Sequence, residues 1–192
     1  MTIKKSLIIQ AILLSIVSLS AQNVTVNLDE EHQTIRGFGG MVHNTWQGGA
    51  GLSAEDAKLA FGAGEGQLGL TALRIPVNEN KADWSKELAA AKLAQSYGAI
   101  VYASPWNPPS NLRDGNRKIP ESNWQAYVDH LNSFAAHMKD QGAPLYAISI
   151  QNEPDWCHEW TCWSADDVYK FLKNYGGQLR KNGTKVITAE SF

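Results

Sequence analysis

The chain has 192 residues, of which 43% are hydrophobic, and its 17 basic and 19 acidic side chains give a formal net charge of −2. This composition is that of a globular protein and excludes a disordered or fibrous chain. The near balance of charge gives no reason to expect a nucleic acid or an acidic membrane as a partner. Seven tryptophans are many for this length, and they indicate either a large aromatic core or flat faces for sugar rings.

Residues 1–21 are predicted to be a signal peptide. Lys4 and Lys5 give a positive start, residues 7–19 form an apolar run, and small residues precede a predicted cleavage after Ala21. The run is shorter than the about 20 apolar residues that cross a membrane. We therefore expect residues 22–192 to be secreted or periplasmic, with no membrane association after cleavage. A buried N-terminal helix is the alternative.

Strand-like and helical stretches alternate after residue 21. The expected strands cover residues 24–28, 34–38, 71–77, 99–104, 145–150 and 185–189. The expected helices cover residues 53–61, 84–97, 122–141 and 164–180, with Ser53 and Ser164 as N-caps. This alternation predicts a parallel α/β fold. The strand runs are nearly continuous in apolar residues, which is typical of strands covered on both faces.

Two architectures fit this order, a doubly wound sheet and a (β/α)8 TIM barrel. The doubly wound sheet needs a phosphate-binding glycine turn after its first strand, but residues 37–40, GFGG, lack that spacing and no helix follows at once. Polar and aromatic residues instead fall just past the strand ends, where barrel enzymes place their active site. We therefore favour the barrel. These residues are Trp46, Asn78, Glu79, Trp106, Asn107, Asn152, Glu153 and Glu190.

Only about five β/α units are present, whereas a closed barrel has eight strands and typically about 250 residues. The sequence stops directly after the fifth of the barrel strands, at residues 185–189. We therefore expect a truncated N-terminal portion of a barrel domain over residues 22–192. An unpaired strand edge of this kind promotes aggregation.

The most informative segment is residues 150–154, IQNEP, where an amide, a carboxylate and a proline follow a buried strand. Burial at a strand end raises a carboxyl pKa, which a general acid near neutral pH requires. Glu153 is therefore a candidate general acid/base, and Asn152 offers a donor and an acceptor to a sugar hydroxyl. A helix-capping or salt-bridged glutamate is the alternative.

Two further residues lie where a barrel enzyme would use them. Three prolines stiffen residues 103–109, so Trp106 is held rigidly and suits the floor of a pyranose site, with a core tryptophan as the alternative. Arg74 lies inside an apolar strand, where a charge needs a partner. We expect it to pair with a carboxylate in the barrel mouth, in a structural or a functional role. His130 and His137 are seven residues apart on a helix and are expected on its surface.

Cys157 and Cys162 are the two cysteines of the chain. In an exported protein such a close pair is a disulfide candidate, provided that the Cα atoms lie within about 7 Å. Two free thiols packed beside a loop are the alternative. Two cysteines without paired histidines at ligand spacing do not make a zinc site, so no metal is predicted.

Four segments together resemble glycoside hydrolase family 30, and more closely its bacterial glucuronoxylanase branch. They are IRGFGGMVHNTW (35–46), LGLTALRIPVNEN (68–80), GAIVYASPWNPPS (98–110) and LYAISIQNEPD (145–155). The resemblance extends over essentially all of the chain after residue 21. It implies a (β/α)8 barrel with a side β-sandwich, to which residues 24–28 would contribute a strand.

The resemblance also implies roles for individual residues. Glu153 would be the general acid/base, and Asn152 would contact the sugar 2-hydroxyl or the nucleophile. Trp106 would line the subsite where the bond is cut, with Trp46 and Arg74 near it. The implied activity is that of an endo-acting β-1,4-xylanase selective for glucuronoxylan, without metal or organic cofactor.

The family's nucleophile is a glutamate after the seventh strand, which this sequence does not reach. Retaining hydrolysis needs two carboxyl groups about 5–5.5 Å apart, and Glu190 is expected to have a structural role beside the site rather than to substitute for the nucleophile. We therefore expect the 192-residue chain alone to be inactive. A sibling exo-β-glycosidase, such as a glucosylceramidase, and a non-catalytic carbohydrate-binding protein are the alternative functions.

Overall fold

The computed structural model describes residues 25–27, 29–30, 32–49, 51–188 and 190–191. The expected signal peptide lies outside these residues. The chain divides into two units, residues 1–34 and residues 35–192. In the first unit, residues 25–27 are exposed and form no strand. The strand expected over residues 24–28 is thus not found in the described residues 25–27. A strand requires backbone hydrogen bonds to a neighbouring strand.

The second unit, residues 35–192, contains a five-stranded parallel sheet. Its strands are β1 (Gly39–Met41), β2 (Ala72–Pro76), β3 (Ile100–Ser104), β4 (Ala147–Ser149) and β5 (Lys185–Ile187). They lie side by side in chain order, and every neighbouring pair is parallel. A doubly wound sheet reverses its strand order, whereas a barrel keeps it. The α/β barrel arrangement is therefore confirmed over five strands, and the doubly wound alternative is wrong.

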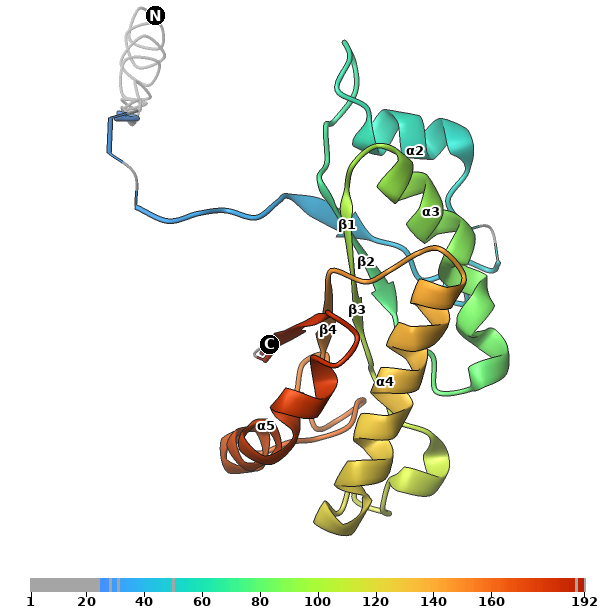
Figure 1. Ribbon diagram of the computed structural model, residues 1–192, viewed down its shortest axis with the longest axis vertical. Coiled ribbons are helices and arrows are strands. Elements are labelled where there is room, and N and C mark those ends of the chain that lie inside the picture. The colour runs from blue at the N-terminus through green and yellow to red at the C-terminus, as the bar shows by residue number, and fades with distance from the viewer. Residues whose placement is uncertain (1–24, 28, 31, 50, 189, 192) are drawn as a thin grey trace, which may run out of the picture. The chain divides into compact units, whose positions relative to one another are not determined.

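One helical connection joins each pair of consecutive strands. The connections contain α2 (Ala54–Phe61), η1 (Lys81–Glu87), α3 (Leu88–Ser96), η2 (Ser110–Leu112), η3 (Glu121–Asn123), α4 (Trp124–Asp140) and α5 (Ala165–Leu179). In Figure 1, α2, α3 and α4 run along the same side of the strands. Ser53 and Ser164 cap α2 and α5 as expected, since their side chains accept from the backbone N–H of Asp56 and Asp167.

The first strand differs from its prediction. It begins at Gly39 rather than spanning residues 34–38. A Cβ atom on Gly39 would lie 1.9 Å from the carbonyl oxygen of Ala72, its partner in β2. Only glycine allows this close approach of two backbones. Gly39 therefore allows the close pairing of β1 with β2, and this contact explains why the strand lies later than its apolar neighbours suggest.

The predicted helix over residues 84–97 is divided in two. Residues Lys81–Glu87 form the 3₁₀ helix η1, which Asn80 caps by accepting from the backbone N–H of Ala82. The indole of Trp84 donates to the carbonyl oxygen of Asn78 at 2.9 Å. This contact binds η1 to the end of β2, so the regular helix α3 starts only at Leu88.

The hydrophobic core lies between the sheet and the helices. Successive strand residues point to opposite faces, and the helix-side residues Leu73, Ile75, Val101 and Ile148 are all at most 2% exposed. Helix α3 packs on β2 and β3, and α5 packs on β5 and α4. The opposite, inner face of the sheet is more open and lines a cavity of about 600 Å³. The packed face thus fixes the positions of the strand ends.

His130 contradicts its prediction as a surface residue. It is 5% exposed and meets the ring of Trp84 edge-on, with 5.4 Å between ring centroids. Burial, assisted by the charge of Lys81, lowers the pKa of His130 to about 4, so its ring is neutral at pH 7. The prediction is wrong because η1 covers this side of α4.

Candidate active site

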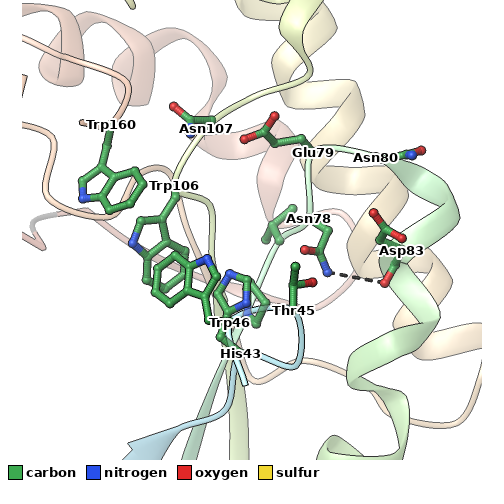
Figure 2. Close-up of a pocket in the computed structure, with 12 residues that line it drawn as sticks. His43, Thr45, Trp46, Asn78, Glu79, Asn80, Asp83, Trp106, Asn107 and Trp160 are labelled. Carbon is green, nitrogen blue, oxygen red and sulfur yellow. Dashed lines mark hydrogen bonds between the residues drawn. The ribbon is translucent and has the colours of Figure 1, made fainter. Parts of the chain in front are cut away.

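A pocket of about 270 Å³ lies at the carboxyl ends of the first strands. Its walls come from the segments that follow β1, β2 and β3 and from the loop after β4 (Figure 2). Tryptophan rings group on one side of the pocket, whereas Glu79, Asn80 and Asp83 lie on the other. This is the rim at which the sequence placed a site, with one wall suited to an apolar ring face and one to hydroxyl groups.

The aromatic wall has three tryptophans and a histidine. Trp46 stacks on His43 at 3.9 Å between centroids, meets Trp106 edge-on at 5.0 Å and stacks on Trp160 at 5.9 Å. Burial lowers the pKa of His43, which keeps this ring neutral. Trp46 is 53% exposed and Trp106 only 8%. Trp46 is therefore the more accessible of the two rings, and the buried Trp106 packs edge-on against it.

Arg74 connects the ends of four strands. From β2, its guanidinium donates to Ser104 Oγ at 3.0 Å and to Asn152 Oδ1 at 2.6 Å. It also forms an ion pair with Glu190 at 3.4 Å and lies 4.7 Å from the ring centroid of Trp106. The charge in the apolar strand thus has a carboxylate partner. It orients Asn152 and lies against Trp106, which are two of the four predicted substrate contacts, the others being Trp46 and Arg74 itself.

Glu153 directly follows Asn152 beyond β4, and its side chain is half-buried rather than buried as the sequence suggested. Its carboxylate Oε2 accepts from the indole N–H of Trp160 at 3.0 Å. Its backbone has φ of +45°, a left-handed conformation that side-chain-bearing residues rarely adopt. The hydrogen bond from Glu153 N to Glu190 O at 2.9 Å helps hold this conformation. Strain of this kind gathers at functional sites.

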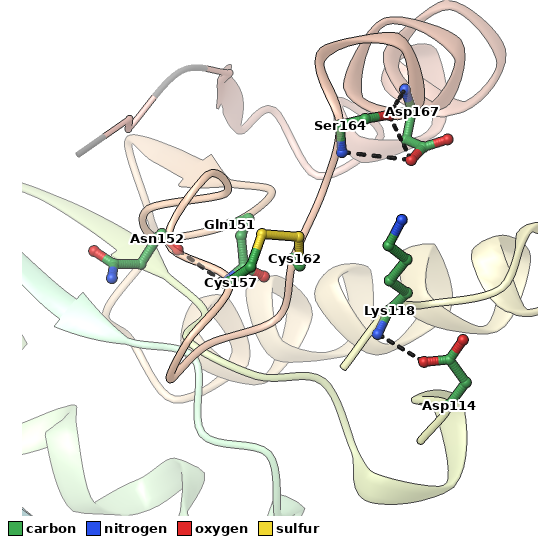
Figure 3. The surroundings of a disulfide bond; sticks show 8 residues. All are labelled: Asp114, Lys118, Gln151, Asn152, Cys157, Cys162, Ser164 and Asp167. Carbon is green, nitrogen blue, oxygen red and sulfur yellow. Dashed lines mark hydrogen bonds between the residues drawn. A yellow bond between two sulfur atoms is a disulfide. The ribbon is translucent and has the colours of Figure 1, made fainter. Parts of the chain in front are cut away.

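Trp160 lies in a short loop closed by a disulfide. Cys157 and Cys162 are bonded, with Cα atoms 4.6 Å apart, and Figure 3 shows the disulfide with Gln151 and Asn152 among its surroundings. Sequence reasoning missed Trp160 as a site residue. The available signal was a tryptophan between two cysteines, seven residues after the candidate acid.

Comparison with known proteins finds relatives of this chain. No protein-family model matches the chain. Two glucuronoxylanases XynC from Bacillus subtilis are its curated relatives: that of strain 168 is 46% identical over 182 residues, and the other is 43% identical over 181. These alignments cover 91% and 90% of this chain, and 42% of each relative.

Two solved structures agree in sequence and in fold. The glycoside hydrolase family 30 subfamily 8 xylanase Xyn30A from Clostridium acetobutylicum is 34% identical, with a TM-score of 0.75 over 86% of this chain and 45% of its own. A family 30 endoxylanase from Clostridium papyrosolvens C71 is 36% identical, with a TM-score of 0.73 over 83% and 43%. Over most of its length this chain is similar to glycoside hydrolase family 30 xylanases. It spans less than half the length of each of these four relatives.

The support of the loop that carries Trp46 is a second feature of the site that the sequence did not reveal. Glu87, at the end of η1, is fully buried, and its Oε1 accepts from the backbone N–H of Asn44 at 3.0 Å. The side chain of Asn44 donates to the carbonyl oxygen of Lys86 at 2.8 Å. These bonds fix the chain between His43 and Trp46. In sequence, Glu87 is only one of several charged residues in an Ala-rich stretch.

The free energy of unfolding of the Glu87→Gln chain is expected to rise, relative to that of the parent chain, as pH rises. Burial raises the pKa of Glu87 above the ordinary 4.5, partly offset by the Asn44 hydrogen bond and by Lys86. Because the folded pKa is the higher one, the contribution of this carboxyl is fully present below about pH 4.5 and is lost as pH rises through the folded pKa. Glutamine cannot ionise, so Glu87→Gln gains on the parent chain over this window.

The measurement is urea unfolding of both chains at several pH values between 4 and 8. The exposed Glu65→Gln serves as the control and should show no trend with pH. A Glu87→Gln difference that does not change with pH would contradict the prediction.

The described residues contain no group of three or more His, Cys, Asp or Glu side chains placed to hold a metal ion. In the same part of the chain, no helix is long and apolar enough to cross a membrane.

Proposed function

We propose that this chain is part of a retaining endo-β-1,4-xylanase that acts on glucuronoxylan, with Glu153 as its general acid/base. The observation that carries this proposal is the position of Glu153. Its carboxylate stands at the end of β4 and is bound by Trp160, which is itself a wall of the aromatic pocket. The names of the relatives, which are glucuronoxylanases and family 30 xylanases, support this substrate.

We propose a role in this reaction for each neighbour of Glu153. A sugar ring lies against Trp46, while Asn152, oriented by Arg74, binds a hydroxyl group at the reacting sugar. Trp160 occupies Oε2 of Glu153, so Oε1 is the oxygen that reaches the glycosidic oxygen. Glu153 protonates that oxygen as the bond breaks, and afterwards takes a proton from the water that attacks the glycosyl intermediate.

The nucleophile is proposed to lie outside this chain. Glu190 is engaged by Arg74 and by Ser104, whose hydroxyl donates to its Oε1 at 2.8 Å, and this suits a residue that positions others. The relatives are more than twice as long as the stretch that matches. In the whole protein a second carboxylate, about 5–5.5 Å from Glu153, completes the retaining pair.

We propose further that the protein is exported. Residues 1–21 have the features of a signal peptide, a basic start followed by a short apolar run. Xylan is a polymer outside the cell, so an enzyme that degrades it has to be secreted or periplasmic. A Cys157–Cys162 disulfide also suits an oxidising compartment.

The test is digestion of glucuronoxylan by the whole protein that contains this chain, with the products followed by mass spectrometry. An endo-xylanase releases internal fragments of several lengths that carry glucuronic acid, whereas the 192-residue chain alone releases essentially nothing. Release of single sugars from chain ends would instead identify an exo-glycosidase. Tight binding without any cleavage by the whole protein would identify a carbohydrate-binding protein.

A further inference from the structure

We propose that Trp160 is a positioning residue for Glu153, and that the Cys157–Cys162 disulfide is what holds Trp160 in place. The inference builds on the proposed role of Glu153 as the acid/base. The contacts that carry it lie in the described residues and do not depend on the sugar. They place a single indole between the carboxylate, the sugar-binding wall and a covalently closed loop.

Trp160 contacts Glu153 and Trp46 at once. Its indole N–H donates to Glu153 Oε2 at 3.0 Å, and its ring lies 5.9 Å from that of Trp46 at an interplanar angle of 24°. A hydrogen bond to a carboxylate is stronger than one to a neutral acceptor. By holding Oε2, it also fixes the direction in which Oε1 points. Because Glu153 extends from a strained backbone position, its side chain needs such a fixed partner. Trp160 therefore sets the direction of Oε1.

The loop that carries Trp160 has no helix or strand of its own. Instead of regular secondary structure, a disulfide and hydrogen bonds on either side of Trp160 hold the loop. The disulfide joins positions 157 and 162 around Trp160, and the backbone N–H of Cys162 donates to Arg117 O at 3.0 Å. The guanidinium of Arg117 also donates to the carbonyl oxygen of Glu159, the residue before Trp160.

Thr161 fixes the other side of the indole. It is fully buried, and its hydroxyl donates to Asn107 Oδ1 at 3.1 Å, beside Trp106. The first half of the loop, residues 157–159, is exposed. The disulfide is thus the covalent constraint on the exposed half, and cleaving it leaves the segment that leads into the indole with the weaker Arg117–Glu159 hydrogen bond.

The experiment uses the 192-residue chain with ¹⁵N-labelled tryptophan. The indole N–H resonance of Trp160 is assigned by its loss in Trp160→Phe, which keeps a ring and removes the donor. In the oxidised chain, Glu153→Gln should move this resonance upfield, because the acceptor loses its charge. Reduction with dithiothreitol, or Cys157→Ala with Cys162→Ala, should move it to the same extent and make it insensitive to Glu153→Gln.

The indole of Trp124 is the internal control, since it donates to Ile119 O at 3.1 Å in the buried core. Its resonance should stay unchanged throughout. A Trp160 resonance that ignores Glu153→Gln in the oxidised chain, or that is the same with and without the disulfide, would overturn the proposal. Movement of the Trp124 resonance on reduction would overturn it as well, because the disulfide would then hold the whole chain rather than this loop.

Xylotriose binding, followed by tryptophan fluorescence, separates this inference from the proposed function. The whole protein that contains this chain should bind when oxidised, and loss of the disulfide should weaken binding about 3- to 10-fold as the Trp160 face is lost from the pocket. Failure of the oxidised whole protein to bind any xylo-oligosaccharide would count against the proposed function, while the resonance of Trp160 still decides the inference. Equal binding with and without the disulfide would count against the inference alone.

Discussion

Glu153→Gln in the whole protein is expected to lower kcat on glucuronoxylan by about 10²- to 10⁴-fold, with little change in KM. Positioned general acid/base catalysis contributes a factor of this size. Glutamine keeps the shape of the side chain and an oxygen that can still accept from Trp160, so the sugar-binding wall stays intact. What is lost is the proton for the leaving oxygen and the base for the incoming water.

The leaving group provides the decisive comparison for this variant. In an aryl xyloside, a good leaving group such as dinitrophenolate departs without protonation. The first step of the reaction then no longer needs Glu153. The initial burst of phenolate measures the rate of this first step. On the aryl xyloside, Glu153→Gln should therefore reduce that rate far less than it reduces kcat on glucuronoxylan. Glu65→Gln on an exposed loop is the matched control and should behave as the parent. An equal loss on both substrates would assign Glu153 a role other than proton transfer.

Arg74→Met is expected to lower the free energy of unfolding by roughly 2–4 kcal/mol, because it leaves the carboxylate of Glu190 without its cation. The two side chains are only 20% and 15% exposed, so water replaces the lost partner poorly. Glu190 Oε2 already lacks a hydrogen-bond partner among the described residues. The same change also frees Asn152, which Arg74 orients at 2.6 Å, so oligosaccharide affinity should fall as well.

Urea unfolding of the chain measures this loss. Lys170→Met is the matched control, since it removes the same charge from an ion pair with Asp166 that is 50% and 68% exposed, and it should lower the free energy of unfolding far less. The double variant Arg74→Met with Glu190→Gln should recover much of the stability, because no buried charge then remains unpaired. Equal costs for the two arginine and lysine variants would contradict the buried ion pair.

Local sequence rules predicted most of the fold. The N-caps at Ser53 and Ser164, and the positions of β2 to β5, follow from capping and from apolar runs that the surrounding chain does not override. The rim also followed, because in parallel strands the carboxyl ends share one edge. β1 was misplaced because its position depends on a close backbone contact between Gly39 and Ala72, which no local pattern reveals.

The sequence predicted those residues of the candidate site whose local sequence is distinctive. It did not predict the residues whose role depends on distant partners. Glu153 and Trp106 stand in distinctive surroundings, whereas the values of Trp160 and Glu87 come from partners 7 and 43 residues away, at Glu153 and Asn44. His130 was assigned to the surface because helical spacing does not say which other element covers a helix face. Partnership across the fold is a tertiary property, and neither composition nor periodicity encodes it locally.

Because of the left-handed backbone at position 153, the residue that would give the most stable fold differs from the glutamate that the proposed activity needs. A side chain in this conformation costs about 1 kcal/mol or more relative to glycine. In laboratory evolution, a screen that rewards heat resistance alone would therefore favour glycine or asparagine at position 153 and enrich robust, inactive proteins. A screen for improved variants needs a catalytic readout in every round, since the proposed acid/base stands at a position where glycine or asparagine would be more stable.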